Sequence, residues 1–295
     1  MEIFRTPSER FGNLPGLPYE PKYREWRGMR LAHLDEGAGP AVVLLHGEPT
    51  WSYLYRKVMG PLLESGFRCI VPDLPGFGRS DKPVDPGWYS YDNHTAAVAT
   101  LFDELDLHDA TIVAHDWGGP IGLRVAIRER RDRIGRIIAM DTGIFTGHQQ
   151  MGEAWLRFRD FVAGHPDLPI KLLIRGGCKK APPREVLAAY EAPFPTEASK
   201  AGAYAFPGLI PLTPDAPGAE EGRAVVEGLI QDRRPALVVW ADSDPVLPVE
   251  PVGRRVRSLF ATAPELTVIP DAGHYLQEDQ GETVGKVIAN WLATR

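Results

Sequence analysis

The stretch Thr111-Ile-Val-Ala-His-Asp-Trp-Gly-Gly-Pro120 indicates the fold of this chain more directly than any other. A β-branched, apolar run leads into Asp116 and then into two glycines and a proline. The small residues Ala114 and Gly118 lie two places before and two places after Asp116. This is the spacing of a nucleophile elbow, a strand-to-helix turn too tight for bulky neighbours. The sequence therefore predicts that Asp116 projects from the end of a strand in an α/β sheet.

An aspartate at this turn indicates different chemistry from the serine of an ester or amide hydrolase. A carboxyl group with an ordinary pKa of about 3.9 is ionised near neutral pH and needs no base to become nucleophilic. It can displace a leaving group at saturated carbon and form an alkyl-enzyme ester. The plainer interpretation is that Asp116 only caps the helix that follows it.

The composition narrows the class of protein. A length of 295 residues fits one large α/β domain, or one such domain with an insertion. A net charge of -6 without a basic cluster disfavours nucleic-acid binding. The eight histidines are scattered without ligand spacing, so we expect neither a metal nor a cofactor.

The targeting features of the chain are equally plain. Two cysteines are too few for a disulfide framework. The N-terminus lacks an apolar signal region, and no apolar stretch is long enough to span a bilayer. We therefore expect a cytoplasmic protein that binds no membrane, and we expect it to be a monomer.

Six short apolar runs are predicted to be buried strands. They cover residues 41–45, 69–72, 110–114, 136–140, 236–240 and 265–269. Helix-like segments separate them, with examples at 93–105, 119–127 and 283–293. Strands that alternate with helices along the chain form a parallel sheet flanked by helices. Ligands of such sheets bind beyond the carboxyl ends of the strands, where most of the polar residues discussed below lie.

Residues 142–212 break this alternation. We expect two helices within them, at 153–162 and at 181–190, and several prolines that interrupt the pattern. The segment is interpreted as a helical cap inserted after the fourth of the predicted strands. Residues 1–141 and 213–295 then form the core domain.

Two further polar residues complete a catalytic set with Asp116. His274 follows the sixth predicted strand, and histidine is the side chain best suited to activate water near neutral pH. Asp244 follows the fifth and can orient the imidazole and stabilise its cation. The order nucleophile, acid, histidine is that of the α/β-hydrolase fold. Asp141 is the alternative acid and Asp242 a third, but Asp244 begins a proline-containing turn at the expected strand end.

The loop His46-Gly-Glu-Pro-Thr-Trp51 follows the first predicted strand. It can aim the backbone N–H of Glu48 at the site, where this group and the backbone N–H of Trp117 would form an oxyanion hole. The indole of Trp117 is a donor without an acceptor, so it could hold a departing halide, which needs no proton. The plainer interpretations are an ordinary loop and aromatic packing at the elbow.

Five strings of sequence together resemble the haloalkane dehalogenases of the α/β-hydrolase superfamily. The resemblance covers nearly the whole chain. It implies an α/β-hydrolase fold with a mostly parallel central sheet, flanking helices and an inserted helical cap. It also implies hydrolysis of haloalkanes to a primary alcohol, a halide ion and a proton. The strings are His46-Gly-Glu-Pro-Thr-Trp-Ser-Tyr-Leu-Tyr-Arg56, Asp73-Leu-Pro-Gly-Phe-Gly-Arg-Ser-Asp-Lys-Pro83, His115-Asp-Trp-Gly-Gly119, Ala192-Pro-Phe-Pro195 and Gly273-His-Tyr-Leu-Gln-Glu-Asp279.

The resemblance also bears on the acid and on the halide site. Glu48 stands where another branch of the family has asparagine. It looks like the branch whose acid follows the later strand, which supports Asp244 over Asp141. In that branch a second tryptophan from the first cap helix completes the halide site. Alignment with family members puts Phe158 at that position, and Trp155 lies three residues earlier, on nearly the same helix face. We expect Trp155 to supply the second donor, with Phe158 as the alternative position and Trp117 then the only indole donor.

Two other functions remain open from the residues. An epoxide hydrolase would use the same aspartate but needs an acid for the leaving oxygen, usually tyrosine, and the predicted cap contains only Tyr190 and Tyr204. A more remote alternative is a non-catalytic ligand receptor with the hydrolase fold. Halide release from 1,2-dibromoethane, against diol formation from styrene oxide, separates the two enzymes, and binding without turnover would indicate the receptor.

Overall fold

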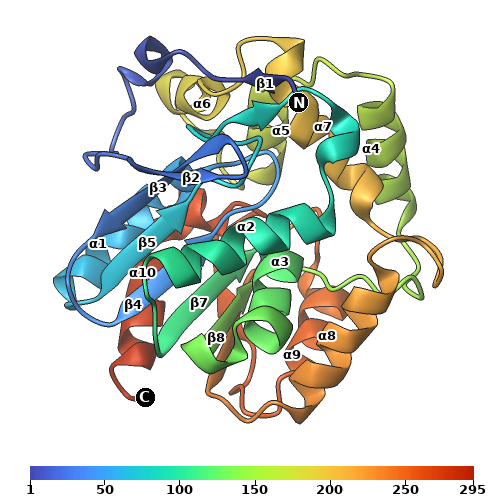
Figure 1. The fold of residues 1–295 in the computed structure, drawn as a ribbon. Coiled ribbons are helices and arrows are strands. Elements are labelled where there is room, and N and C mark those ends of the chain that lie inside the picture. Colours follow the sequence, from blue (N-terminus) through green and yellow to red (C-terminus); the bar gives the residue numbers. More distant parts are fainter.

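An eight-stranded sheet runs through the centre of the computed structural model, which describes the backbone of residues 1–295 and the side chains of all of them except Ala154 (Figure 1). The strand order is β10-β9-β8-β7-β4-β5-β3-β2. Strands β5, β4, β7, β8, β9 and β10 are parallel, whereas β3 and β2 add an antiparallel edge. The strands are β2 (Lys22–Trp26), β3 (Met29–Glu36), β4 (Ala41–Leu45), β5 (Arg68–Pro72), β7 (Ala110–His115), β8 (Ile134–Met140), β9 (Ala236–Ala241) and β10 (Thr267–Ile269). The short strands β1 (Ile3–Phe4) and β6 (Lys82–Pro83) form a separate antiparallel pair.

All six predicted strands are confirmed, each to within two residues of its expected bounds. Every residue of β7 and of β9 is buried. Because helices cover both faces of a parallel sheet, its central strands are continuous apolar runs rather than alternating ones, which is why the pattern could be recognised.

One edge of the sheet is an antiparallel hairpin, β2–β3, which the sequence patterns did not predict. Trp26 pairs with Met29 across a two-residue turn, and both turn residues, Arg27 and Gly28, have positive φ (50° and 76°). Such a turn matches the twist of the two strands. Such turns are usually recognised in a sequence by Asn-Gly or Asp-Gly. Because this turn has arginine in the first position, the hairpin was not predicted.

Helices cover both faces of the sheet (Figure 1). Helices α1 and α10 pack together, and α3 contacts both α2 and α8. The helix predicted at 283–293 begins earlier, at Leu276. Its first turns were not predicted because they are polar and lack apolar periodicity. Their Glu278 and Asp279 nevertheless suit the positive end of a helix. These helices are α1 (Arg56–Glu64), α2 (Tyr91–Glu104), α3 (Gly118–Arg124), α8 (Ala219–Gln231), α9 (Arg254–Ser258) and α10 (Leu276–Leu292).

Between β8 and α8 the chain forms four further α-helices, which gather in the upper part of the view in Figure 1. The two helices predicted here are present, although the second begins at Arg184 rather than at residue 181, directly after Pro183. The helices are α4 (Glu153–Ala163), α5 (Ile170–Gly177), α6 (Arg184–Glu191) and α7 (Ala201–Ala205). None of the helices in the described part of the chain combines the length and apolar character that crossing a bilayer requires.

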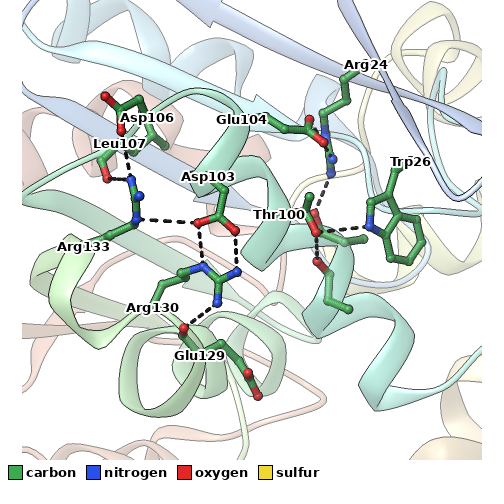
Figure 2. Close-up of polar contacts among 12 residues, drawn as sticks. Arg24, Trp26, Thr100, Asp103, Glu104, Asp106, Leu107, Glu129, Arg130 and Arg133 are labelled. Atoms are coloured by element: carbon green, nitrogen blue, oxygen red, sulfur yellow. Dashed lines mark hydrogen bonds and ion pairs between the residues drawn. The ribbon is translucent and has the colours of Figure 1, made fainter.

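Polar contacts hold the C-terminal half of α2 on two sides (Figure 2). The indole of Trp26, in the edge hairpin, donates to the hydroxyl of Thr100 over 3.1 Å. On the other side Asp103 accepts from Arg130 (Nε to Oδ1, 2.8 Å) and pairs with Arg133 at 3.6 Å, just before β8. Exposed ion pairs contribute about 0–1 kcal/mol each, so the pairs of Asp103 add little to the stability of the fold.

His94 of α2 is buried in an aromatic cluster. Its ring lies 4.7 Å from that of Phe206 and stacks on Tyr89 at 5.9 Å (centroid distances). Among the described residues, neither ring nitrogen of His94 has a hydrogen-bond partner. Burial, followed by the neighbouring His46, lowers the pKa of His94 to about 3, so the folded protein holds it neutral.

We predict that His94→Phe reduces the sensitivity of the fold to acid. Between the ordinary histidine pKa of 6.5 and about 3, the unfolded chain binds a proton at His94 that the folded chain does not. The contribution of this site is complete above pH 6.5 and decreases by about 1.4 kcal/mol per pH unit as the pH falls. Urea unfolding between pH 6 and 4 gives the free energy of unfolding as a function of pH, and we expect this dependence to be less steep for the variant. The control His148→Ala, at an exposed site, should keep the wild-type dependence. Equal slopes for both variants would show that His94 does not titrate in this way.

Candidate active site

Asp116 lies directly after β7 in a sharp turn that leads into α3. Its φ of 50° is in the left-handed region, which is strained for a residue with a side chain. The turn closes with a hydrogen bond from the Gly119 N–H to the Asp116 carbonyl (2.9 Å). A Cβ at Gly118 would overlap the backbone of β4, and one at Gly47 would overlap the Asp116 carboxylate. The small residues therefore let the strand end, the loop and the helix start approach closely enough to present Asp116.

The two oxygens of the Asp116 carboxylate have different surroundings. Oδ1 accepts the backbone N–H of Glu48 over 2.8 Å, and the backbone N–H of Trp117 also hydrogen-bonds the carboxylate. Oδ2 faces His274. Burial opposes ionisation, but the hydrogen bond and the charge of His274 outweigh it, so the pKa of Asp116 is lowered. The side chain keeps 18% of its surface exposed, enough for a ligand to reach it.

His274 lies between two carboxylates. Its Nε2 is 3.5 Å from Oδ2 of Asp116, and its Nδ1 is 2.8 Å from Oδ2 of Asp244. Burial lowers the pKa of an imidazole, but here the charge of Asp244 and the hydrogen bonds with Asp116 and Asp244 raise the pKa of His274 well above its ordinary value. The geometry brings together the three side chains that sequence reasoning selected.

Asp244 makes the contacts of an orienting acid. Its Oδ1 accepts the N–H groups of Val246 (2.7 Å) and Leu247 (2.9 Å), which leaves Oδ2 for His274. Burial disfavours its charge, yet the charge and hydrogen bond of His274 lower its pKa. Asp242, the third candidate, instead accepts backbone N–H groups of the loop after β10, from Asp271 at 3.1 Å and from the next residue at 3.2 Å.

Asp141, the alternative acid, lies beside Asp244 rather than at the imidazole. It directly follows β8 and is fully buried. Both of its oxygens are near the Ala241 N–H (3.0 and 3.2 Å), and its side chain hydrogen-bonds Asp244. Burial, and then the charge of Asp244, raise the pKa of Asp141 well above its ordinary value.

Three features of the site, two contacts and one unpartnered oxygen, were not expected from the sequence. The hydroxyl of Thr142 donates to the Asp116 carbonyl over 2.7 Å, and Nε2 of His115 contacts the His274 carbonyl at 2.8 Å. The Glu48 carboxyl group is buried, and its Oε1 has no partner among the described residues. Burial, and then Asp116, raise the pKa of Glu48, which favours its neutral form. The sequence around Thr142, His115 and Glu48 carries no signal for these features, because each depends on a residue at the end of another strand.

The two predicted halide donors have different surroundings. Trp117 precedes α3, and its buried ring packs on Phe145 (5.8 Å) and Phe206 (4.9 Å). Trp155 is half-buried on α4, with the Arg159 guanidinium 5.7 Å from its ring centroid. Phe158 on the same helix is also half-buried, and both rings pack against the core. The second donor position therefore stays a prediction.

The two tyrosines of the predicted cap make contacts away from Asp116. The Tyr190 hydroxyl donates to Glu278 over 2.8 Å, and Glu278 forms a buried ion pair with Arg56 (2.7 Å). The Tyr204 hydroxyl is 3.4 Å from the carbonyl of Ala163. These contacts disfavour an epoxide hydrolase, which would need both phenols as proton donors at Asp116. Among the described residues, no group of three or more His, Cys, Asp or Glu is placed to hold a metal ion.

Known proteins are similar to this chain over nearly its full length. Haloalkane dehalogenases from Psychrobacter cryohalolentis and Mycobacterium marinum are 40% and 39% identical to it, each over 99% of this chain and over 98% and 100% of their own lengths. The chain belongs to the haloalkane dehalogenase family. The predicted resemblance is thus confirmed, and the enzyme is a hydrolase that acts on carbon–halide bonds.

The fold agrees with this family. Residues 40–166 match the family described as alpha/beta hydrolase fold. The structure of the haloalkane dehalogenase DpaA from Paraglaciecola agarilytica, described as tetrameric, superimposes with a TM-score of 0.92 at 34% identity, over 97% of each chain. The predicted α/β-hydrolase fold with a mostly parallel sheet is confirmed.

We predict that the indole N–H of Trp117 is required for turnover. Trp117→Phe keeps a ring against Phe206 but removes the donor, and loss of one such donor typically lowers kcat by a factor of about a hundred to a thousand. Stopped-flow halide release and bromide quenching of tryptophan fluorescence measure the effect. Trp155→Phe should behave in the same way if Trp155 supplies the second donor. A silent Trp155→Phe, together with a more active Phe158→Trp, would assign that position to residue 158 and leave one indole donor in this enzyme.

Proposed function

We propose that this dehalogenase works through an alkyl ester on Asp116, which water activated by His274 then hydrolyses. The observation that carries the proposal is the asymmetry of the Asp116 carboxylate. One oxygen is held by the N–H of Glu48, and the other is 3.5 Å from the imidazole. The held oxygen suits an oxyanion, and the other suits attack on a substrate carbon.

In the first half-reaction, Oδ2 of Asp116 attacks the carbon that bears the halogen. The new bond is the Oδ2–carbon bond of an ester, and the carbon–halogen bond breaks with both electrons leaving on the halide. No proton moves in this step. The indole of Trp117 would stabilise the halide as its charge develops, and we propose Trp155 as the second donor.

In the second half-reaction, Nε2 of His274 removes a proton from water as the water oxygen attacks Cγ of Asp116. The negative charge that develops on Oδ1 would be stabilised by the N–H groups of Glu48 and Trp117. The bond between Cγ and the alkyl-bearing oxygen then breaks. The alcohol leaves with the proton that His274 took from water. Asp116 is restored with one oxygen from water, and the second proton of the water goes to solvent.

The state of the imidazole fits this order of events. The Asp116 charge is among the causes that raise the pKa of His274. Ester formation removes that charge, so the pKa of His274 decreases when a neutral base is needed. Asp244 would stabilise the imidazolium that forms, as the acid of a triad does.

We propose residues 142–212 as the cap that selects the substrate. Phe145 and Phe206, from the two ends of this segment, both pack on Trp117. This environment favours a small apolar halogenated substrate, with water and halide as the other small molecules at the site.

We also propose that the enzyme is a cytoplasmic monomer. Cys69 and Cys178 are both free, which suits a reducing compartment. Sedimentation velocity should give a single species near the chain mass of 32.6 kDa. Because the related DpaA structure is described as tetrameric, a species of several chain masses at micromolar concentration would contradict the monomer.

We predict that His274→Phe separates the two half-reactions. The Asp116 carboxylate is already charged, so the variant should release one halide per enzyme in a burst and then stop, with the alkyl ester accumulating on Asp116. Rapid-quench halide analysis and peptide mass spectrometry measure the burst and the adduct. The control Asp116→Ala should show neither. Loss of the burst in a folded His274→Phe variant would mean that the histidine also acts in the first step.

A further inference from the structure

Asp141 and Asp244 are two acidic side chains in contact, one at the end of β8 and one just after β9. Their side chains hydrogen-bond each other. Two ionised carboxylates have only acceptors, so such a bond needs a proton on one of them. Among the described side chains, no Lys, Arg or His forms an ion pair with Asp141 that could balance a second charge.

The contacts of each group decide which one holds the proton. Asp244 accepts three N–H groups, from Val246, Leu247 and the His274 ring, all of which stabilise its charge. Among the described residues, the only N–H group that the Asp141 carboxyl group accepts is that of Ala241, which is shared between its two oxygens. The charge therefore belongs on Asp244 and the proton on Asp141.

We propose that Asp141 is a positioning residue that stays a neutral carboxylic acid during turnover and donates its proton in a hydrogen bond to Asp244. This bond holds Asp244 against Nδ1 of His274 and takes part of its negative charge. The inference rests on the proposed roles of Asp244 and His274. It gives Asp141 a function different from that of the alternative triad acid, because Asp141 acts only through Asp244.

The proton on Asp141 matters for the base. Two ionised carboxylates at this position would add a second negative charge near His274 and hold the imidazole as a cation, which cannot accept a proton from water. No other titratable group described near His274 supplies a positive charge that could balance an ionised Asp141. Asp116 is an anion until it is alkylated, and burial, followed by the charge of His274, lowers the pKa of His115 to about 4 and leaves it neutral.

The protonation state can be tested without turnover by infrared spectroscopy. The wild-type-minus-Asp141→Asn difference spectrum at pH 7 should contain the C=O stretch of a protonated carboxylic acid, which shifts in D2O. Glu48 contributes equally to both proteins and cancels. A difference spectrum with carboxylate bands alone would show that Asp141 is ionised and would overturn the proposal.

The positioning role has a kinetic signature. Asn at position 141 keeps a donor to Asp244 and tolerates the φ of 33°, so Asp141→Asn should retain most of the wild-type kcat. Asp141→Ala removes the donor and should lower kcat about ten- to a hundredfold, the effect of one hydrogen bond to a charged group. Its acidic limb should move to higher pH, because the unshared charge on Asp244 raises the pKa of His274. The first-turnover halide burst should remain, since alkylation needs only Asp116.

The outcomes separate this inference from the proposed function. If the kcat of Asp141→Asn is as low as that of Asp141→Ala, the negative charge of residue 141 is required and the inference is wrong. An active Asp244→Asn variant would also contradict it, because Asp141 acts only through Asp244. If Asp141→Ala does not fold, as judged by circular dichroism, the infrared result decides. A wild-type enzyme that releases no halide would refute the proposed function, while the infrared band would still establish the proton on Asp141.

Discussion

The close approach of three backbone segments at Asp116 is the constraint on which the rest of the site depends. The end of β7, the start of α3 and the loop after β4 meet where a Cβ at Gly47 would overlap the Asp116 carboxylate. Likewise, a Cβ at Gly119 would overlap the side chain of Thr142, whose hydroxyl holds the Asp116 carbonyl. The strained φ of Asp116 persists because these contacts determine it from several directions. Only in this arrangement does the N–H of Glu48 reach one oxygen of the carboxylate and leave the other available.

A second constraint is the number of acidic groups around one imidazole. Four carboxyl groups lie in this region, where unpaired buried charges are costly. Those of Asp141, Asp244 and Glu48 are buried, and that of Asp116 is partly exposed. The surroundings separate them into two kinds. Asp116 and Asp244 receive hydrogen bonds that stabilise their charges, whereas burial favours the neutral forms of Asp141 and Glu48. A single histidine then faces two charged carboxylates instead of four, which is compatible with the proposed role of His274 as base and acid.

The segment between β8 and α8 is joined to the rest of the chain by specific polar and aromatic contacts. Tyr190 of α6 donates to Glu278, which is paired with Arg56 of α1. Phe206 reaches both Trp117 and the buried His94. The same aromatic packing that surrounds the proposed halide donor therefore also fixes this segment on the core.

The sequence by itself determined the strands of the parallel sheet, the turn at Asp116 and the family, because these depend on local patterns. Continuous apolar runs, small residues at fixed spacing and full-length motifs can be read without knowing which segments meet. The β2–β3 hairpin escaped because Arg27-Gly28 lacks the usual turn residues, and the start of α10 escaped because its first turns are polar.

The sequence favoured Asp244 as the acid, but only the tertiary structure shows which aspartate contacts the imidazole, and only its contacts bear on which one holds a proton. Asp141, Asp242 and Asp244 all follow neighbouring strands, so their order along the chain could not rank them. Their different contacts depend on the relative positions of three strand ends, which bring Asp244 to 2.8 Å from His274 and Asp141 to Asp244. Hydrogen bonding and burial at that meeting point set the charge of each group, and these are properties of the folded chain rather than of any segment.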